Sequence, residues 1–405
     1  MNKLLLEKIA NTYGTPSYVY DIARLRKNID FFLRHAKDGR SMVAVAMKAN
    51  SNFHLWQEIS RAGLGADAVS IGEILLALKA GIAPGKIIFS GVGKTHRELE
   101  FAITKGIRFI NVESEEELEM IAGIVEEKSL KVDISFRLNP DIAIESNPKI
   151  STGGLQHKFG CSLESVLKMC EAYRSSEHIR VGAIHAHIGS QVHDPKSYSE
   201  LKLFFAECIP LIQSTLGYAL TAINFGGGFG IDEHGNVGDW IEDWMREAID
   251  FAQANGCLAI FEPGRSLFAN VGVLLTTVIR TKEIQGKKFV VVDAAMNDFM
   301  RTALYGAIHK IICLDDGGEG QSSFDIVGPV CESTDTFVYN APLPSGLKAR
   351  DLLYLDQAGA YGFSMSSQYN MRCRAAEVLV DADDNLKLSR RRETFDDLMM
   401  TTEGD

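Results

Sequence analysis

The chain has 405 residues, of which 46% are hydrophobic and 23% charged, and its formal net charge is −11. A nucleic-acid-binding face would be basic, so this balance argues against a nucleic-acid partner. The sequence contains no run of about 18 apolar residues and no signal-peptide pattern at its start, so we expect no membrane segment. Its seven cysteines are scattered and include no Cys-x-x-Cys pair, which predicts reduced thiols in a cytoplasmic protein.

Short apolar runs alternate with helical stretches between residues 40 and 265. This alternation is typical of a parallel sheet built from repeated strand–helix units. Eight such units in about 225 residues favour a (β/α)8 TIM barrel over an open doubly wound sheet, and we place this domain at residues 28–268. The predicted strands are 42–47, 66–69, 86–89, 109–112, 132–138, 181–188, 222–225 and 258–261.

The helices between these strands have their own start and stop signals. Thr95-x-x-Glu98 and Ser114-x-x-Glu117 are patterns of a capping box, in which side chains bind the open N–H groups of a helix start. Gly81 follows a helical run, at the position where a left-handed C-terminal cap is expected.

After residue 265 the pattern changes to runs rich in β-branched and aliphatic residues, separated by turn residues. This pattern predicts a second, mainly β domain over residues 269–405. The early segment 17–20 also resembles a strand, so we assign residues 1–27 to the same domain. Its predicted strands are 276–284, 289–293, 324–327, 352–355, 376–380 and 386–388.

The residues that follow the barrel strands are the main functional signal, because active sites of TIM barrels lie at the carboxyl ends of the strands. They include one lysine, a glycine run and an acid, the three features that an aldehyde cofactor with a phosphate and a ring nitrogen requires. The full set is Lys48, Ser70, Ser90, Glu113, Asn139, Gly189, Ser190, Gly226, Gly227, Gly228 and Glu262.

Lys48 ends the first strand, where desolvation would lower its pKa and free its amine for a Schiff base. The alternative is a surface lysine that closes a strand. The glycines from Gly226 to Gly230 follow the seventh strand, where barrel phosphate sites are common, although a tight loop would also use them.

Glu262 ends the eighth strand, and an acid there can keep a pyridine nitrogen protonated while Arg265 binds a carboxylate or phosphate. The alternative is a structural ion pair at the barrel rim. His185 and His187 lie on one face of the sixth strand. No further ligand accompanies them in the sequence, so we expect no metal; one imidazole can stack on a flat cofactor, and core packing is the alternative.

Six motifs then follow in the order found in one enzyme family. They are Ala-Met-Lys-Ala-Asn at 46–50, His-Ile-Gly-Ser-Gln at 187–191, Gly-Gly-Gly-Phe-Gly at 226–230, Glu-Pro-Gly-Arg at 262–265, Gly-Pro-Val-Cys-Glu-Ser at 328–333 and Gly-Ala-Tyr-Gly at 359–362. Over nearly its whole length the chain resembles the fold-type III decarboxylases that depend on pyridoxal 5′-phosphate (PLP), and among them the diaminopimelate decarboxylases. The resemblance implies an alanine racemase-like fold.

The resemblance also implies roles for individual residues. Lys48 would carry the cofactor, His187 would stack on its ring, Glu262 would pair with the ring nitrogen, and Cys331 would return a proton to Cα. The residues implied near the phosphate are Ser190, Gly228, Gly264, Arg265 and Tyr361.

In such enzymes a partner subunit completes the site, which implies a homodimer in which Cys331 and Glu332 act across the interface. The resemblance implies that the distal carboxylate of the substrate is bound by arginine and tyrosine and that Glu332 binds its distal amine. The other substrate residues are Arg265, Arg301, Tyr305 and Tyr361. The alternatives are an exposed salt bridge for Arg301 and a buried core thiol for Cys331.

The function that these observations favour is decarboxylation of meso-2,6-diaminopimelate to L-lysine. Three departures from the family pattern, Val45, Thr302 and Cys373, leave room for a modified distal pocket. Decarboxylation of another basic or conjugated amino acid, racemisation, and a PLP-binding relative without activity are therefore kept as alternatives.

Overall fold

The computed structural model describes residues 2–34, 39–142, 158–315 and 320–402. The chain forms two compact units, and each contains segments from distant parts of the sequence. The barrel unit comprises residues 28–48 and 56–266, and the β unit comprises residues 1–27, 49–55 and 267–405. None of the helices in the described residues is long and apolar enough to cross a membrane.

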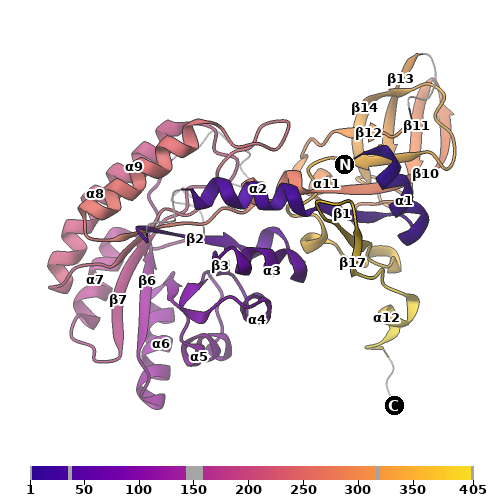
Figure 1. The fold of residues 1–405 in the computed structure, drawn as a ribbon. Helices are drawn as coiled ribbons and strands as arrows, with labels where there is room; N and C mark the ends of the chain where they lie inside the picture. Colours follow the sequence, from indigo (N-terminus) through magenta and orange to yellow (C-terminus); the bar gives the residue numbers. More distant parts are fainter. Residues whose placement is uncertain (1, 35–38, 143–157, 316–319, 403–405) are drawn as a thin grey trace. The chain divides into compact units, whose positions relative to one another are not determined.

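Eight parallel strands close the barrel in sequence order, which confirms the predicted fold class (Figure 1). The strands are β2 (Ser41–Ala46), β3 (Gly65–Ala68), β4 (Ile87–Phe89), β5 (Phe109–Val112), β6 (Val132–Arg137), β7 (Ile179–His185), β8 (Ala222–Asn224) and β9 (Leu258–Phe261). The helices that alternate with them are α2 (Ile22–Leu33), α3 (Phe53–Arg61), α4 (Ile71–Ala80), α5 (His96–Lys105), α6 (Glu115–Lys128), α7 (Leu163–Tyr173), α8 (Pro195–Leu216) and α9 (Trp240–Ala254).

The barrel strands are short apolar runs because parallel strands are covered on both faces. One buried layer is formed by Ala44, Ile88, Phe109, Ala183, Ala222 and Ile260. Phe109 packs where β7 carries Gly182: a Cβ on that glycine would lie 2.8 Å from the Phe109 ring. The Phe109 ring therefore occupies the space that a side chain at position 182 would need.

Two of the three predicted helix signals are confirmed. Thr95 and Glu98 form both hydrogen bonds of a capping box, and Gly81 closes α4 in the left-handed conformation with φ 98°. For Ser114 the predicted helix start is confirmed, but the predicted capping box is wrong. Its side chain caps α6, but Glu117 accepts hydrogen bonds from the Glu113 N–H and the Lys94 ammonium instead of returning to Ser114.

The β unit contains a nine-stranded sheet, in which β1 pairs antiparallel with β10 and parallel with β16. The early strand therefore joins this sheet, as predicted. Its strands are β1 (Ser17–Asp21), β10 (Gly272–Ile284), β11 (Lys287–Val292), β12 (Ile311–Cys313), β13 (Gln321–Val327), β14 (Thr336–Pro344), β15 (Leu352–Leu355), β16 (Ala376–Val380) and β17 (Leu386–Arg390). The helices and 3₁₀ turns outside the alternating barrel series are α1 (Lys3–Tyr13), η1 (Met47–Ala49), η2 (Pro84–Lys86), α10 (Arg265–Phe268), η3 (Ala269–Val271), α11 (Arg301–Tyr305), η4 (Phe363–Met365), η5 (Tyr369–Met371) and α12 (Phe395–Met399).

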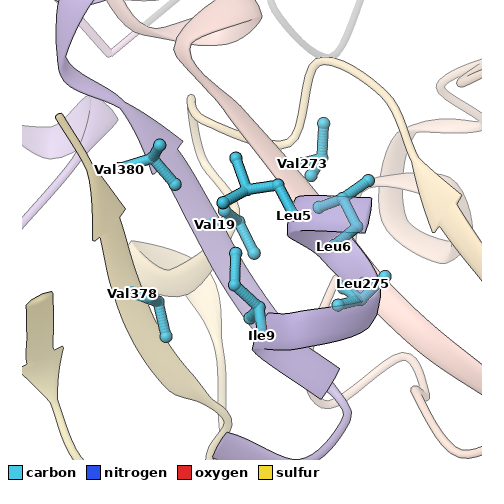
Figure 2. Close-up of a cluster of buried hydrophobic side chains, with 8 residues drawn as sticks. All are labelled: Leu5, Leu6, Ile9, Val19, Val273, Leu275, Val378 and Val380. Carbon is cyan, nitrogen blue, oxygen red and sulfur yellow. The ribbon is translucent and has the colours of Figure 1, made fainter. Parts of the chain in front are cut away.

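Helix α1 was not expected from the sequence, and it covers one face of the β-unit sheet. Asn2 caps it by accepting a hydrogen bond from the Leu5 N–H at 2.9 Å. Figure 2 shows the buried cluster that it forms with β1, β10 and β16, made of Leu5, Leu6, Ile9, Val19, Val273, Leu275, Val378 and Val380. Each large aliphatic side chain buried in this way contributes about 1.5–3 kcal/mol, so this contact holds α1 on the sheet.

Candidate active site

Lys48 lies in the 3₁₀ turn η1, directly after β2. Lys48 is exposed, so the expected desolvation of its amine is wrong for this structure. Its ammonium nevertheless acts on the neighbouring acids. Burial raises the pKa of Asp67 and Glu73, and the charge of Lys48 opposes that rise.

Glu262 follows β9 and is buried, and its two carboxylate oxygens contact residues of β8 and β7. Asn224 Nδ2 donates to Oε1 at 2.6 Å, and His185 Nε2 lies 3.2 Å from Oε2. Burial would raise the pKa of Glu262, but His185, Asn224 and Lys48 together lower it below the ordinary value. The strand ends therefore hold a negative charge at a fixed place.

Asp67 is a second buried carboxylate in the barrel mouth, and the sequence reasoning missed it because it lies within β3 and not after it. It accepts a hydrogen bond from Ser90 Oγ at 2.5 Å, and Asn111 Nδ2 in turn donates to Ser90 Oγ at 2.9 Å. Burial raises the pKa of Asp67 well above its ordinary range, and the charge of Glu262 adds to the rise. Glu262 is thus the member of the pair that ionises first.

His187 is tied to the glycine run by a hydrogen bond from the Gly227 N–H to Nδ1, at 3.2 Å. Burial lowers the pKa of His187 well below its usual range, and the charges of Lys48 and Arg137 add to this effect. The ring is therefore neutral, with its hydrogen on Nε2. A neutral, oriented imidazole suits stacking on a flat cofactor ring.

Three groups suited to a phosphate gather after β7, β8 and β9. Gly228 has φ 96°, and a Cβ there would lie 2.1 Å from the Gly189 carbonyl oxygen, so only glycine allows this close approach. Among the described residues no acceptor is recorded for the Gly228 N–H. Arg265 Nη2 donates to Ser190 Oγ at 3.4 Å, which leaves the Ser190 hydrogen available for another acceptor. Gly264 is buried in the same turn as Arg265, and the set fits the phosphate of PLP.

The other polar residues at strand ends serve the scaffold. Glu113 pairs with Arg137 at 2.9 Å, Ser70 caps α4, and Asn139 accepts a hydrogen bond from the Asp141 N–H. Their presence after strands was therefore not by itself a sign of chemistry.

Cys331 and Glu332 lie in a loop of the β unit, and both are exposed. The core-thiol alternative for Cys331 is therefore excluded. The carboxylate of Asp335 braces the loop by accepting hydrogen bonds from the Val330 and Met296 N–H groups at 2.8 and 2.7 Å. Asn370 Oδ1 accepts from the Cys331 N–H at 3.0 Å, so the loop is held from two sides.

Arg301 begins α11 and is buried, which excludes the exposed salt bridge that was its alternative role. Its guanidinium carbon lies 5.8 Å from the ring centres of both Tyr305 and Tyr361, and its Nε lies 3.4 Å from His309 Nε2. Tyr361 itself has φ 56°, an uncommon conformation for a tyrosine. Three residues predicted to bind substrate are thus neighbours within the β unit.

Next to this cluster, Asp298 is buried and ionises with difficulty. Burial raises its pKa to about 7, although a hydrogen bond from the Ala295 N–H and the charges of Arg372 and Arg392 oppose the rise. The unfolded chain ionises this group near its ordinary pKa. The folded state therefore loses stability as the pH rises from about 4 through 7.

We expect Asp298→Asn to stabilise the protein at pH 8 by on the order of 2–4 kcal/mol, and much less at pH 5. The amide keeps the acceptor for Ala295 and removes the buried charge. Urea unfolding at the two pH values measures the difference. Asp325→Asn is the control. It should destabilise the protein, because it removes the carboxylate that pairs with Lys287 Nζ at 2.6 Å. Equal stabilisation of Asp298→Asn at both pH values would contradict the ionisation argument.

The structure divides the predicted site residues between the two units. The barrel unit holds Lys48, His187, Ser190, Gly228, Glu262, Gly264 and Arg265, and the β unit holds Arg301, Tyr305, Cys331, Glu332 and Tyr361.

Comparison with known proteins finds one family throughout. The family described as "Pyridoxal-dependent decarboxylase, pyridoxal binding domain" matches residues 22–269. Diaminopimelate decarboxylases of Helicobacter pylori and Zymomonas mobilis are both 40% identical to the chain; each alignment covers 97% of this chain, and 96% and 94% of the relatives, respectively.

Solved structures agree with this result. Diaminopimelate decarboxylase of H. pylori in complex with L-lysine superposes with a TM-score of 0.89 at 37% identity, over 98% of both chains. The enzyme of M. jannaschii, also in complex with L-lysine, gives 0.89 at 33% identity over 98% of this chain and 94% of that one. A viral arginine decarboxylase at 22% identity shares the fold, with a TM-score of 0.81. The chain therefore belongs to the pyridoxal-dependent decarboxylases, as a member of the diaminopimelate decarboxylase family.

Proposed function

We propose that the chain decarboxylates meso-2,6-diaminopimelate to L-lysine and carbon dioxide, with PLP bound at Lys48. The observation that carries the proposal is the barrel mouth, where an ionised Glu262, a neutral His187 and the phosphate-binding set accompany the only lysine that follows a predicted barrel strand. The relatives are named for this substrate, and structures of the H. pylori and M. jannaschii enzymes hold L-lysine, the product expected of the reaction.

Bound PLP supplies a sink for the electron pair that remains at Cα when carbon dioxide leaves. The protein's part is to bind and orient. Glu262, fixed through Asn224 and His185, holds a proton on the ring nitrogen by staying ionised. His187, fixed by the Gly227 N–H, presents a flat neutral ring for stacking.

Substrate recognition is assigned to the β unit. The guanidinium of Arg301 lies near the rings of Tyr305 and Tyr361. A distal carboxylate would bind there strongly through two charge-assisted hydrogen bonds to this guanidinium. Glu332 would bind the distal amine and Cys331 would return a proton to Cα. Arg265 stands beside Ser190, a position that favours its phosphate role over its substrate role.

We infer a homodimer in which Cys331 and Glu332 serve the site of the partner subunit. The exposure of both side chains supports this arrangement. Exposed apolar residues on either side of Asn370, Tyr369 at 45% and Met371 at 58%, offer surface for an interface. A cytoplasmic enzyme without a nucleic-acid partner fits the free cysteines and the acidic chain.

A decarboxylation assay with added PLP tests the proposal across diaminopimelate, lysine, ornithine and arginine. We expect carbon dioxide and L-lysine from diaminopimelate alone. Release of carbon dioxide only from another amino acid would refute the substrate assignment. A change of chirality without carbon dioxide would indicate a racemase, and purified protein without the visible absorbance of lysine-bound PLP would indicate a relative that has lost the chemistry.

We expect Glu332→Gln to raise KM for diaminopimelate about tenfold with a smaller change in kcat, because a charged hydrogen bond to the distal amine is lost. Steady-state kinetics measures both constants. Glu283→Gln removes the same charge from an exposed position of β10 and serves as the control. A KM that changes equally in both variants would argue against an amine-binding role for Glu332.

A further inference from the structure

A cavity of about 690 Å³ lies at the end of the barrel opposite Lys48. Its walls come from the segments that lead into β5, β6, β7 and β8, at the amino ends of these strands. This volume is within the range of small-molecule sites, roughly 300–1,000 Å³. The amino-terminal face of a TIM barrel ordinarily serves stability, so a cavity of this size there requires an explanation.

The walls of this cavity, which we call the floor site, carry an excess of positive charge. Four cations line it, against two carboxylates, Asp133 and Glu177. Arg174 pairs with Glu171 outside the lining. In the described part of the chain, no salt bridge is recorded for the other three cations, which are Arg108, Lys131 and Arg180. With Arg174 set aside, these three cations face two carboxylates, so the lining keeps a positive balance.

Two hydroxyl groups of the floor site are held in place with their own hydrogens available. Ser176 Oγ accepts hydrogen bonds from the backbone N–H groups of residues 178 and 179, at 3.3 and 3.1 Å. Tyr218 Oη accepts from the Val181 N–H at 3.1 Å. The backbone N–H groups therefore orient each hydroxyl oxygen. Each O–H remains free to donate a hydrogen bond to an acceptor in the cavity.

Arg108 supplies the most directed cation. Its guanidinium carbon lies 5.1 Å from the centre of the Phe109 ring, a contact that limits the side chain to few orientations. Its Nε is buried and has no hydrogen-bond acceptor among the described residues, so no protein carboxylate neutralises the guanidinium through this atom.

We propose that the floor site binds a small multivalent oxyanion, a compound that carries phosphate or carboxylate groups. Arg108, Lys131 and Arg180 supply the charge, and Ser176 and Tyr218 supply oriented hydroxyl donors. All five belong to the barrel unit, and none of them is used by the proposed decarboxylation.

Titration calorimetry tests this proposal with inorganic pyrophosphate and with citrate, at constant ionic strength. The enzyme is saturated with PLP beforehand, so that the phosphate-binding set at Gly228 is filled. We expect binding of one or both probes at one site per chain, and the probe that binds identifies phosphate or carboxylate groups as the preferred ones. Binding of neither probe would overturn the proposal.

We expect Arg108→Gln and Arg180→Gln each to weaken that binding about tenfold, because each removes a charged hydrogen bond. Arg180 is exposed, so its variant keeps the fold even where Arg108→Gln does not. Lys196→Gln removes one charge from an exposed site on α8 and is the matched control. Decarboxylation without added anion should stay at the wild-type rate in Arg180→Gln. Equal binding by wild type and Arg180→Gln, or equal loss in Lys196→Gln, would refute the site.

Discussion

Replacement of Lys48 by alanine is expected to lower kcat for decarboxylation by at least about 10³-fold and to abolish the visible absorbance of lysine-bound PLP. The reason is chemical: the barrel mouth presents this amine after β2, and the substitution removes the only group proposed to bind the cofactor covalently. The variant should fold normally, because the Lys48 side chain is exposed and supports no core packing.

A second variant separates the amine from its charge. The ammonium of Lys48 opposes the rise that burial imposes on the pKa of Asp67, so part of its effect could be electrostatic. Lys48→Arg keeps the charge and cannot attach the cofactor in the same way. If Lys48→Arg retains most of the wild-type rate, the covalent role is wrong. Lys196→Ala, on the exposed surface of α8, should leave both rate and absorbance unchanged.

The barrel could be predicted because each of its strands is buried on both faces and appears in the sequence as a short apolar run. All eight predicted strands are present, and their bounds differ by only a few residues. Two strands of the β unit were missed for a physical reason. Strand β12 has three residues, and β14 (Thr336–Pro344) contains two prolines, which are atypical of strands.

The gathering of these candidate residues could be predicted because barrel topology brings all strand ends to one rim. The environment of each residue could not, because it depends on partners that are distant in sequence. Asp67 lies 23 residues from Ser90 along the chain and contacts it directly. Similarly, Glu117 leaves the expected capping box because Lys94 and the Glu113 N–H compete for its carboxylate.

The exposure of Lys48 has a similar origin. The sequence placed Lys48 at the end of a strand, and that geometry led to the expectation of a desolvated amine. The chain instead forms the turn η1 over Met47–Ala49, in which Lys48 is exposed while its charge still acts on the buried Asp67 and Glu262. Three residues of 3₁₀ turn are too short to be recognised from a sequence pattern.

We expect Glu262→Gln to reduce kcat roughly 10²–10³-fold, by analogy with the loss of one electrostatic contact to the reacting system. The amide has the same shape and fits between Asn224 and His185, but it cannot hold a proton on the ring nitrogen by its charge. Covalent binding of PLP at Lys48 should persist. The visible absorbance would therefore remain while the decarboxylation rate falls. In Lys48→Ala, by contrast, both the absorbance and the rate should be lost.

The pH dependence gives an independent test of Glu262. Burial alone would raise the pKa of this carboxyl, but His185, Asn224 and Lys48 lower it. Glu262 therefore stays ionised as the pH falls toward the ordinary pKa of a glutamate. Glu262→Asp keeps the charge one methylene further from the ring and should recover part of the rate that Glu262→Gln loses. If Gln and Asp are equally slow, charge without the correct position does not restore the rate; if Gln is as fast as wild type, the ring nitrogen does not depend on Glu262. We expect no loss of the wild-type rate from protonation of Glu262 between pH 8 and the ordinary pKa of 4.5. Steady-state rates of the three proteins over this range, with absorbance as a check on bound cofactor, decide between these outcomes.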